Sequence, residues 1–212
     1  QADPVLDFEV TPNRPDWLGV RGIARDLAAT GIGTLKSHEI AEIPGSFPCP
    51  VKVELDWPEA CPVYAGRVIR GVTNGESPDW LKKAIKAIGL RPINFLADIT
   101  NMISVDRCRP LHVYDLAKLE GPIRARRGKG AADRFEALDN KVHVPGEDQC
   151  VIADDARCLG FGGIMGGTYS GVSATTTDVF IESAWFEPLQ VRATAKATGI
   201  DSDAKYRFER GV

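Results

Sequence analysis

The feature that most limits the possible folds is a run of short strand-like segments in the second half of the chain. Segments rich in β-branched and aromatic residues follow one another here, separated by turn residues. They span residues 123–127, 134–138, 141–144, 150–153 and 178–183. Asp139 and Asn140 lie between two of them and predict a hairpin. Because no helical segment interrupts the run, a regular alternation of helices and parallel strands is excluded, and antiparallel pairing is expected.

Helices are predicted on both sides of this strand-rich region. Apolar residues recur at helical spacing, with a glycine after the last of them, in residues 17–30, 80–88 and 188–198. The apolar stripe of the second segment includes Trp80, so this side chain is expected to be buried. Ser77 stands before Pro78 at the start of the second helix and is expected to cap it.

The remaining segments complete a mixed pattern. Residues 51–55 and 63–72 read as strands, whereas residues 90–115 mix polar and apolar residues and indicate short helical turns. Residues 11–16 contain two prolines and predict a turn that is not helical. These elements predict an α+β domain built on antiparallel strands. With no internal repeat, residues 1–212 are expected to form a single domain.

Composition excludes several classes of protein. No apolar run reaches the length of a membrane span and no signal-peptide pattern occurs, so a cytoplasmic location is expected. The chain has 5 cysteines without a C-x-x-C pair and 3 widely separated histidines, a pattern that supports neither a disulfide framework nor a metal site. The chain starts at Gln1 and stops at Val212 without a terminal cap, which we interpret as a piece excised from a longer polypeptide.

The charge balance bears on nucleic-acid binding. The formal net charge is −3, whereas nucleic-acid-binding domains usually carry a basic excess. Basic clusters at residues 124–129 and 205–210 have two interpretations, an ordinary solvated surface or a local contact with RNA. If RNA binds this chain, most of the affinity is expected to come from elsewhere in a longer protein.

Individual motifs leave structural and functional interpretations open. Residues 160–167 are rich in glycine but match neither a P-loop nor a dinucleotide fingerprint, which leaves a sharp bend or the floor of a pocket. His112 is either a structural histidine or a functional one, and no nucleophile motif accompanies it. Glu182 shares a strand face with Phe180 and Ala184, so its carboxylate needs either solvent or a polar partner.

Seven motifs carry a resemblance to a known family. In order they are Thr11-Pro-Asn-Arg-Pro-Asp16, Arg91-Pro-Ile-Asn94, Asp98-Ile-Thr-Asn101, Pro110-Leu-His112, Gly163-Ile-Met-Gly-Gly167, Glu182-Ser-Ala-Trp-Phe186 and Arg207-Phe-Glu-Arg-Gly-Val212. Each motif alone is weak, but the ordered series resembles the editing region of bacterial phenylalanyl-tRNA synthetase β subunits. The match covers nearly the whole chain, from about residue 7 onward.

The resemblance implies a fold and a site. The implied fold has three layers, with a β-sandwich of unusual antiparallel topology and flanking helices. The implied activity is hydrolysis of the ester that joins tyrosine to tRNA(Phe) by mistake. By motif position, the implied catalytic residues are His112 and Ser202. The implied substrate-binding residues are Glu182, Gly162, Gly166, Ala204, Arg91, Thr100 and Asn101. In the family, the glutamate at position 182 reads the tyrosine hydroxyl, no metal is used, and water attacks directly.

The resemblance also implies partners. These are the acceptor end of tRNA(Phe), the synthetase α subunit and other domains of the β subunit, with no membrane contact. No cofactor is expected in this domain, because ATP and magnesium belong to the synthetic site of the partner subunit. The alternative is a non-catalytic module of the same synthetase that docks tRNA or supports neighbouring domains.

Several positions depart from the family pattern. Ser202 stands where threonine is frequent, Gly162 where alanine is usual, and Lys205 where serine is usual. Residues 107–110 replace a more common Leu-Gly-Gln-Pro. These departures leave the shape of the pocket and its local charge open.

Elementary energetics explain why such a site is needed. A pocket for phenylalanine sees tyrosine as the same ring with one added hydroxyl, and an apolar pocket rejects such an addition only about 100-fold. A second site that demands the hydroxyl can supply the rest. Phenylalanine would leave a buried carboxylate there unpaired, at a cost of roughly 2–5 kcal/mol.

Overall fold

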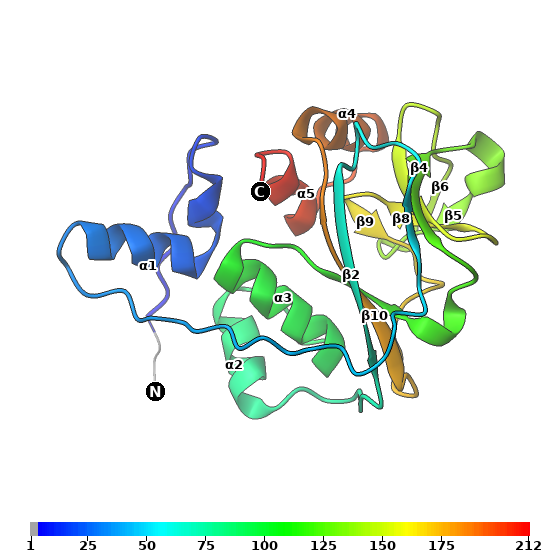
Figure 1. The fold of residues 1–212 in the computed structure, drawn as a ribbon. Coiled ribbons are helices and arrows are strands. Elements are labelled where there is room, and N and C mark those ends of the chain that lie inside the picture. Colours follow the sequence, from blue (N-terminus) through cyan, green and yellow to red (C-terminus); the bar gives the residue numbers. More distant parts are fainter. Residues whose placement is uncertain (1–3) are drawn as a thin grey trace.

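A computed structural model describes residues 4–212 and arranges them in three layers (Figure 1). The helices α2 (Asp79–Ala87) and α3 (Phe95–Arg107) cover one face of a three-stranded sheet. A five-stranded sheet packs against the opposite face of that sheet. The predicted α+β class and the three-layer sandwich are therefore confirmed.

The three-stranded sheet has its last strand in the middle. Its order is β2 (Val63–Arg70), β10 (Asp178–Trp185) and β3 (His112–Asp115), and both pairings are antiparallel. The predicted strands 63–72 and 178–183 correspond to β2 and β10.

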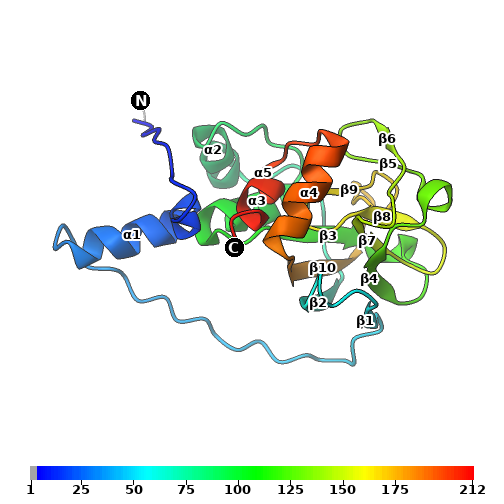
Figure 2. The ribbon, with the colours of Figure 1, turned by 90° about the horizontal axis from the view of Figure 1, so that it is seen from above.

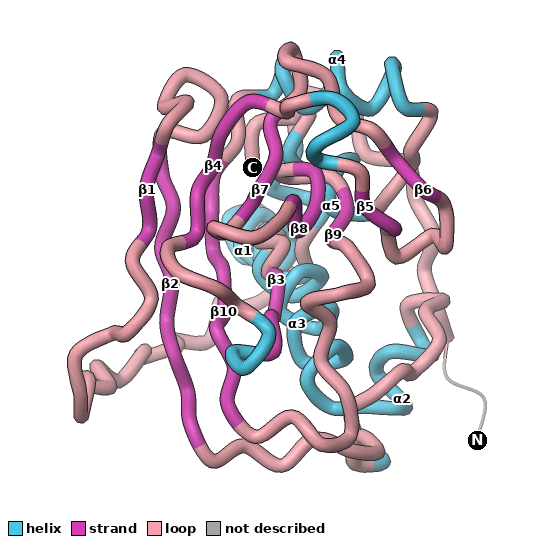
Figure 3. The backbone as a smooth tube through the Cα atoms, turned by 90° about the vertical axis from the view of Figure 1, so that its right-hand side faces the viewer, coloured by secondary structure: helices cyan, strands magenta, loops and turns pink. Residues whose placement is uncertain are grey.

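The five-stranded sheet runs along the other side of the sandwich (Figure 3). Its order is β1 (Val53–Leu55), β4 (Ile123–Arg127), β7 (Cys150–Ala153), β8 (Cys158–Phe161) and β9 (Met165–Gly166). The pairing of β1 with β4 is parallel and the other three are antiparallel. A separate hairpin joins β5 (Phe135–Glu136) to β6 (Val142–His143), and Asn140 in its turn has a φ of 60°, which confirms the predicted hairpin.

The main core lies between the two sheets because successive strand residues point to opposite faces. Phe180 of β10 and Tyr114 of β3 pack there with apolar residues of the second sheet, including Val151 and Leu159. The intervening Val179 faces the other way and packs against Leu96 of α3. This alternation places Phe180, Glu182 and Ala184 on the buried face, as predicted.

Two helices lie at one end of the sandwich. The helix α4 (Pro188–Thr198) has the predicted bounds, and Gly199 ends it in the left-handed region with a φ of 68°. The short helix α5 (Asp203–Phe208) follows and was not predicted. Two 3-10 turns, η2 (Leu116–Lys118) and η3 (Gly130–Asp133), connect strands elsewhere.

The region 90–115 differs from the prediction. Instead of short helical turns it contains the continuous helix α3 and then the strand β3, so His112 begins a strand. Ser77 does not cap α2, because its hydroxyl donates to the buried carboxylate of Asp98 at 2.6 Å. Trp80 is 58% exposed, and α2 instead buries Leu81 and Ile85.

An N-terminal arm, which we define as residues 4–35, projects from the sandwich (Figures 1 and 2). It contains the 3-10 turn η1 (Pro15–Leu18), which begins inside the segment predicted to be non-helical, and the helix α1 (Val20–Ala29). Neither element has a buried residue, so the apolar side chains that recur at helical spacing in this segment remain at least partly exposed.

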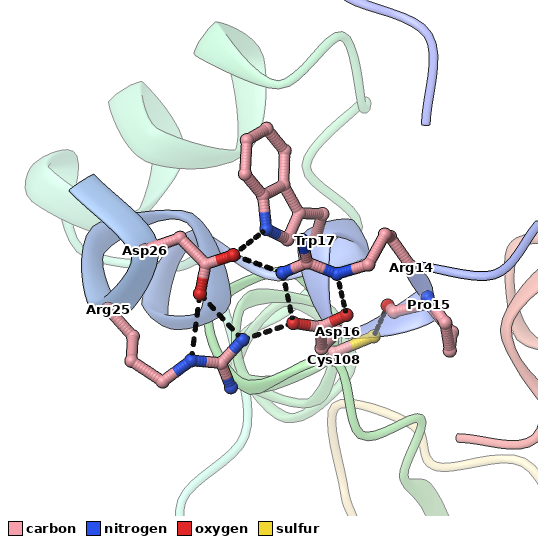
Figure 4. A network of polar contacts seen from close by, with 7 residues as sticks. All are labelled: Arg14, Pro15, Asp16, Trp17, Arg25, Asp26 and Cys108. Atoms are coloured by element: carbon pink, nitrogen blue, oxygen red, sulfur yellow. Dashed lines mark hydrogen bonds and ion pairs between the residues drawn. The ribbon is translucent and has the colours of Figure 1, made fainter. Parts of the chain in front are cut away.

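Polar contacts hold the N-terminal arm together (Figure 4). Arg14 and Arg25 each contact both Asp16 and Asp26, and the indole of Trp17 donates to Asp26 at 2.8 Å. These contacts join residues before and within α1. A long connector then runs from α1 to β1 (Figure 2).

Candidate functional site

The candidate site is built around Glu182, on the central strand of the three-stranded sheet. Glu182 pairs with Gly66 of β2 on one side and with His112 of β3 on the other. Only 7% of its surface is exposed. Burial raises the pKa of this carboxyl group, whereas hydrogen bonds from Tyr114 and Tyr64 lower it. The interpretation of Glu182 as a water-facing residue at a strand end is therefore wrong.

Two phenols satisfy one oxygen of this carboxylate. The hydroxyl of Tyr114 donates to Oε2 at 2.6 Å, and the hydroxyl of Tyr64 donates to the same atom at 2.8 Å. Tyr114 pairs with Phe180 and Tyr64 pairs with Ala184, each two residues from Glu182 along β10. The phenols therefore approach diagonally from both neighbouring strands, a distance that long aromatic side chains can span.

A glycine beside Glu182 makes room for an aromatic ring. A Cβ at Gly66 would overlap the ring of Phe180, which lies across this position. The Phe180 ring centroid is 6.4 Å from that of Tyr64 and 6.1 Å from that of Tyr114. The absence of a side chain at residue 66 thus allows Phe180 to fill the space between the two tyrosines.

His112 lies next to the carboxylate as a neutral imidazole. Desolvation lowers its pKa to about 4, so the ring is uncharged at neutral pH. The ring packs edge-on against Tyr114 with centroids 4.4 Å apart. Its Nε2 atom is buried, and no group among residues 4–212 forms a hydrogen bond with it. A buried polar atom without a partner calls for an explanation, and a ligand or water that completes the site is one.

A cavity of about 70 Å³ lies beside these groups, enough for several water molecules. Its walls come from β3, from the segment that leads into it, from β7, from the β8–β9 hairpin, from β10 and from α5. The lining residues are Pro110, Leu111, His112, Tyr114, Ile152, Gly160, Phe161, Gly163, Ile164, Met165, Gly166, Glu182, Ala204 and Phe208. The cavity thus combines one carboxylate and one imidazole with several apolar side chains, a combination typical of small-molecule sites.

The glycine-rich segment is both a bend and a wall of this cavity. It forms β8, a tight turn and β9, with Gly163 at a φ of 72°. A Cβ at Gly166 would lie 2.8 Å from Nε2 of His112, so glycine allows the imidazole to approach the backbone closely. The two interpretations of residues 160–167 are therefore compatible.

Ser202 and Ala204 connect α5 to the cavity. The Ser202 hydroxyl donates to the carbonyl of Ile164 at 2.6 Å and accepts from the amide of Lys205 at 3.1 Å. Its single proton is thus engaged, and the residue both caps α5 and holds the β8–β9 hairpin. Ala204 lies two residues further along and lines the cavity.

The structure brings together only part of the residue set expected from the motifs. His112, Gly166, Glu182 and Ala204 line one cavity, and Ser202 lies directly behind its wall. Gly162 lies outside the lining set, and a Cβ there would be 2.7 Å from the ring of Phe186.

The remaining three expected residues lie on the helical side of the molecule. Thr100 and Asn101 belong to α3, and Arg91 is exposed in the segment before it. The Thr100 hydroxyl donates to the carbonyl of Ala97 within the same helix. None of the three lines the cavity.

Sequence reasoning missed Tyr64 and Tyr114, although each had a signal. Tyr64 lies in a correctly predicted strand. Tyr114 follows His112 by two residues, so a strand would place His112 and Tyr114 on the same face. Because residues 90–115 were interpreted as helical turns, this alternation was not applied to Tyr114.

The described residues contain neither a cluster of metal ligands nor a membrane-spanning helix. Across residues 4–212, no three histidine, cysteine, aspartate or glutamate side chains are grouped as metal ligands. In the same range, no helix has both the length and the apolar character needed to cross a membrane.

Comparison with known proteins defines the family. The model of the B3/4 domain matches residues 60–212, which include every residue that lines the cavity. The chain therefore belongs to the B3/4 domain family.

The chain is similar to phenylalanine–tRNA ligase β subunits. It is 50% identical to the β subunit of Cereibacter sphaeroides over 99% of this chain, and 51% identical to that of Rhodopseudomonas palustris over 100% of it. It spans about a quarter of the length of these relatives, 26% in both cases. A solved N-terminal fragment of the phenylalanyl-tRNA synthetase β subunit from Pyrococcus horikoshii gives a TM-score of 0.45 at 17% identity, covering 89% of this chain and 58% of the fragment.

Proposed function

We propose that this chain is the editing domain of a phenylalanine–tRNA ligase β subunit and hydrolyses the ester of tyrosine misattached to tRNA(Phe). The observation that carries the proposal is the buried Glu182 beside a small cavity that several apolar side chains line. An aromatic ring can lie against the apolar walls, and its hydroxyl can donate to the carboxylate. A ring without a hydroxyl would leave the second oxygen of that carboxylate, Oε1, without a donor, which disfavours phenylalanine.

The other residues of the site have separate roles in this proposal. Neutral His112 can donate to or accept from a water molecule or the ribose through Nε2, because that atom is unpaired. Ser202 supports the cavity by fixing the Ile164 carbonyl. Gly166 and Ala204 form part of the cavity wall, and Gly162 would act indirectly by leaving room for the ring of Phe186.

The proposed binding surface is wider than the cavity. Arg91 and Asn101 would contact parts of the tRNA that lie outside the cavity, whereas Thr100, which is buried in α3, would support that surface. The proposed partners are the tRNA(Phe) acceptor end, the synthetase α subunit and other β-subunit domains, in the cytoplasm. ATP and magnesium would act only at the synthetic site of the partner subunit.

The ion pairs formed by basic residues support a low affinity of this domain alone for RNA. Arg126 forms a bidentate ion pair with Asp133, at 2.6 and 2.8 Å, and Arg124 pairs with Glu54 at 2.7 Å. Cations that are already paired with carboxylates release few counterions from RNA, so most of the affinity would come from other domains.

One observation favours the alternative, a non-catalytic module that docks tRNA or supports neighbouring domains. The N-terminal arm exposes apolar side chains, with Val20 52% and Leu27 42% exposed. Such a surface suits contact with another domain.

Deacylation of tRNA(Phe) charged with tyrosine or phenylalanine, by the intact synthetase, tests the proposal. Glu182→Ala should slow hydrolysis of the tyrosyl ester about 10- to 150-fold, the equivalent of one hydrogen bond to a charged group. Hydrolysis of the phenylalanyl ester should not slow, because that ring has no hydroxyl to pair. Equal losses on both esters would assign Glu182 to pocket structure. Inactivity of the wild-type enzyme on the tyrosyl ester would favour the non-catalytic module.

A further inference from the structure

Glu182 is held by its own chain before any ligand arrives. Both phenol hydroxyls bind Oε2, Tyr114 at 2.6 Å and Tyr64 at 2.8 Å. Within residues 4–212, no donor forms a hydrogen bond with Oε1, and Glu182 lines the cavity. One oxygen is thus saturated and the other remains available.

The geometry points to Tyr64 and Tyr114 as positioning residues that bind one oxygen of Glu182 and so present the other to a ligand hydroxyl. This inference rests on the proposed function, since it concerns how the same carboxylate selects a phenol. A ligand phenol on Oε1 would become the third phenol on a single carboxylate.

The surroundings explain why two donors are needed. Besides the phenols, the titratable groups close to Glu182 are His112 on β3, Cys61 before β2 and Cys150 on β7. The imidazole pKa is lowered to about 4, and burial raises the pKa of both thiols, that of Cys150 to about 12. These neighbours are therefore neutral near pH 7, and the phenols are the groups that offset the burial of the charge.

The two tyrosines differ in a way that makes the inference testable. Tyr114 lines the cavity and can touch a ligand, whereas Tyr64 does not line it. A change at Tyr64 therefore reaches the ligand only through Glu182. Tyr64→Phe keeps the ring that stacks near Phe180 and removes only the hydroxyl.

The experiment measures the ratio of tyrosyl to phenylalanyl ester hydrolysis by the intact synthetase between about pH 4.5 and 8.5. The Tyr64→Phe variant should shift the pH midpoint of this ratio upward by roughly one unit, because a lost hydrogen bond to a charged group changes its ionisation about tenfold. Tyr114→Phe should shift it in the same direction. Tyr169→Phe is the matched control, since Tyr169 is 44% exposed and lies outside the cavity lining.

A second background separates positioning from a general loss of structure. In a Glu182→Gln enzyme, residue 182 cannot ionise, so Tyr64→Phe should no longer move the pH midpoint. An unchanged midpoint for Tyr64→Phe with Glu182 present would overturn the inference. So would an equal effect of Tyr64→Phe in both backgrounds, because that result indicates damage to folding.

The proposed function fails by a different result. If Glu182→Ala leaves the preference for the tyrosyl ester intact, Glu182 is not the reading group, whatever Tyr64→Phe does. If Glu182→Ala erases the preference and Tyr64→Phe changes neither the ratio nor its midpoint, only the positioning role is rejected.

Discussion

The sandwich and the N-terminal arm differ in the groups that stabilise their carboxylates. In the sandwich the buried carboxylate of Glu182 is bound by two neutral phenols. In the arm, Asp16 and Asp26 share two arginines at the surface, and apolar side chains such as Leu27 remain exposed. The comparison indicates that apolar packing dominates in the sandwich, whereas partly exposed ion pairs dominate in the arm.

The largest expected difference comes from removing one apolar side chain from each region. Phe180→Ala should lower the free energy of unfolding by about 3–5 kcal/mol, because Phe180 is 0% exposed and its loss leaves a cavity. Leu27→Ala, on a helix with no buried residue, should change it by less than about 0.5 kcal/mol. Urea denaturation of both variants measures the difference. Comparable losses would show that the arm is packed against another surface.

A smaller effect is expected from adding one methyl group in each region. Gly66→Ala forces the Phe180 ring out of its place and should cost about 1–3 kcal/mol of unfolding free energy. Gly33→Ala in the arm has no atom within 4 Å of the added Cβ and should stay within about 0.5 kcal/mol of wild type. Thermal unfolding of the two variants checks this pair. A neutral Gly66→Ala would mean that Phe180 has room to move.

The smallest effect is expected from neutralising one carboxylate of the arm. Hydrogen bonds from Arg14, then Trp17 and Arg25, lower the pKa of Asp26 to about 2. A lowered pKa means that the stabilisation is complete above about pH 4, the usual value for aspartate, and is lost as the pH falls through about 2. Asp26→Asn should therefore speed hydrogen exchange of the α1 amides near neutral pH and leave exchange of the β10 amides unchanged. The substitution should have no effect in 1 M salt, because charges are then screened within about 3 Å. Faster exchange in β10 as well would contradict the separation of the two regions.

The same contrast explains which parts of the fold were predictable from the sequence. Strand alternation placed Phe180, Glu182 and Ala184 on one face, and the glycine after residue 198 marked the end of α4. Both signals are local, because a few neighbouring residues determine them.

The parts that were missed depend on distant residues. Tyr64 and Tyr114 are 118 and 68 residues from the glutamate they bind, so no sequence window contains the site. The helix α3 buries the polar residues Asp98, Thr100 and Ser104, which weakened the apolar periodicity that marks a helix. Only the folded chain shows that Asp98 is satisfied by Ser77 and by the amide of Ile93, at 2.6 and 2.9 Å.

The central place of β10 in the three-stranded sheet has a consequence for the order of folding during synthesis. The strands β2 and β3 leave the ribosome early, but each pairs within this sheet only with β10. The strands β7, β8 and β9 follow one another and can pair as soon as they appear. Until residue 185 is made, β2 and β3 have open edges, the condition in which a nascent chain depends most on protection from aggregation. Because the strand that closes these edges also carries Glu182, the carboxylate and its two phenols can meet only in a chain whose sandwich is already complete.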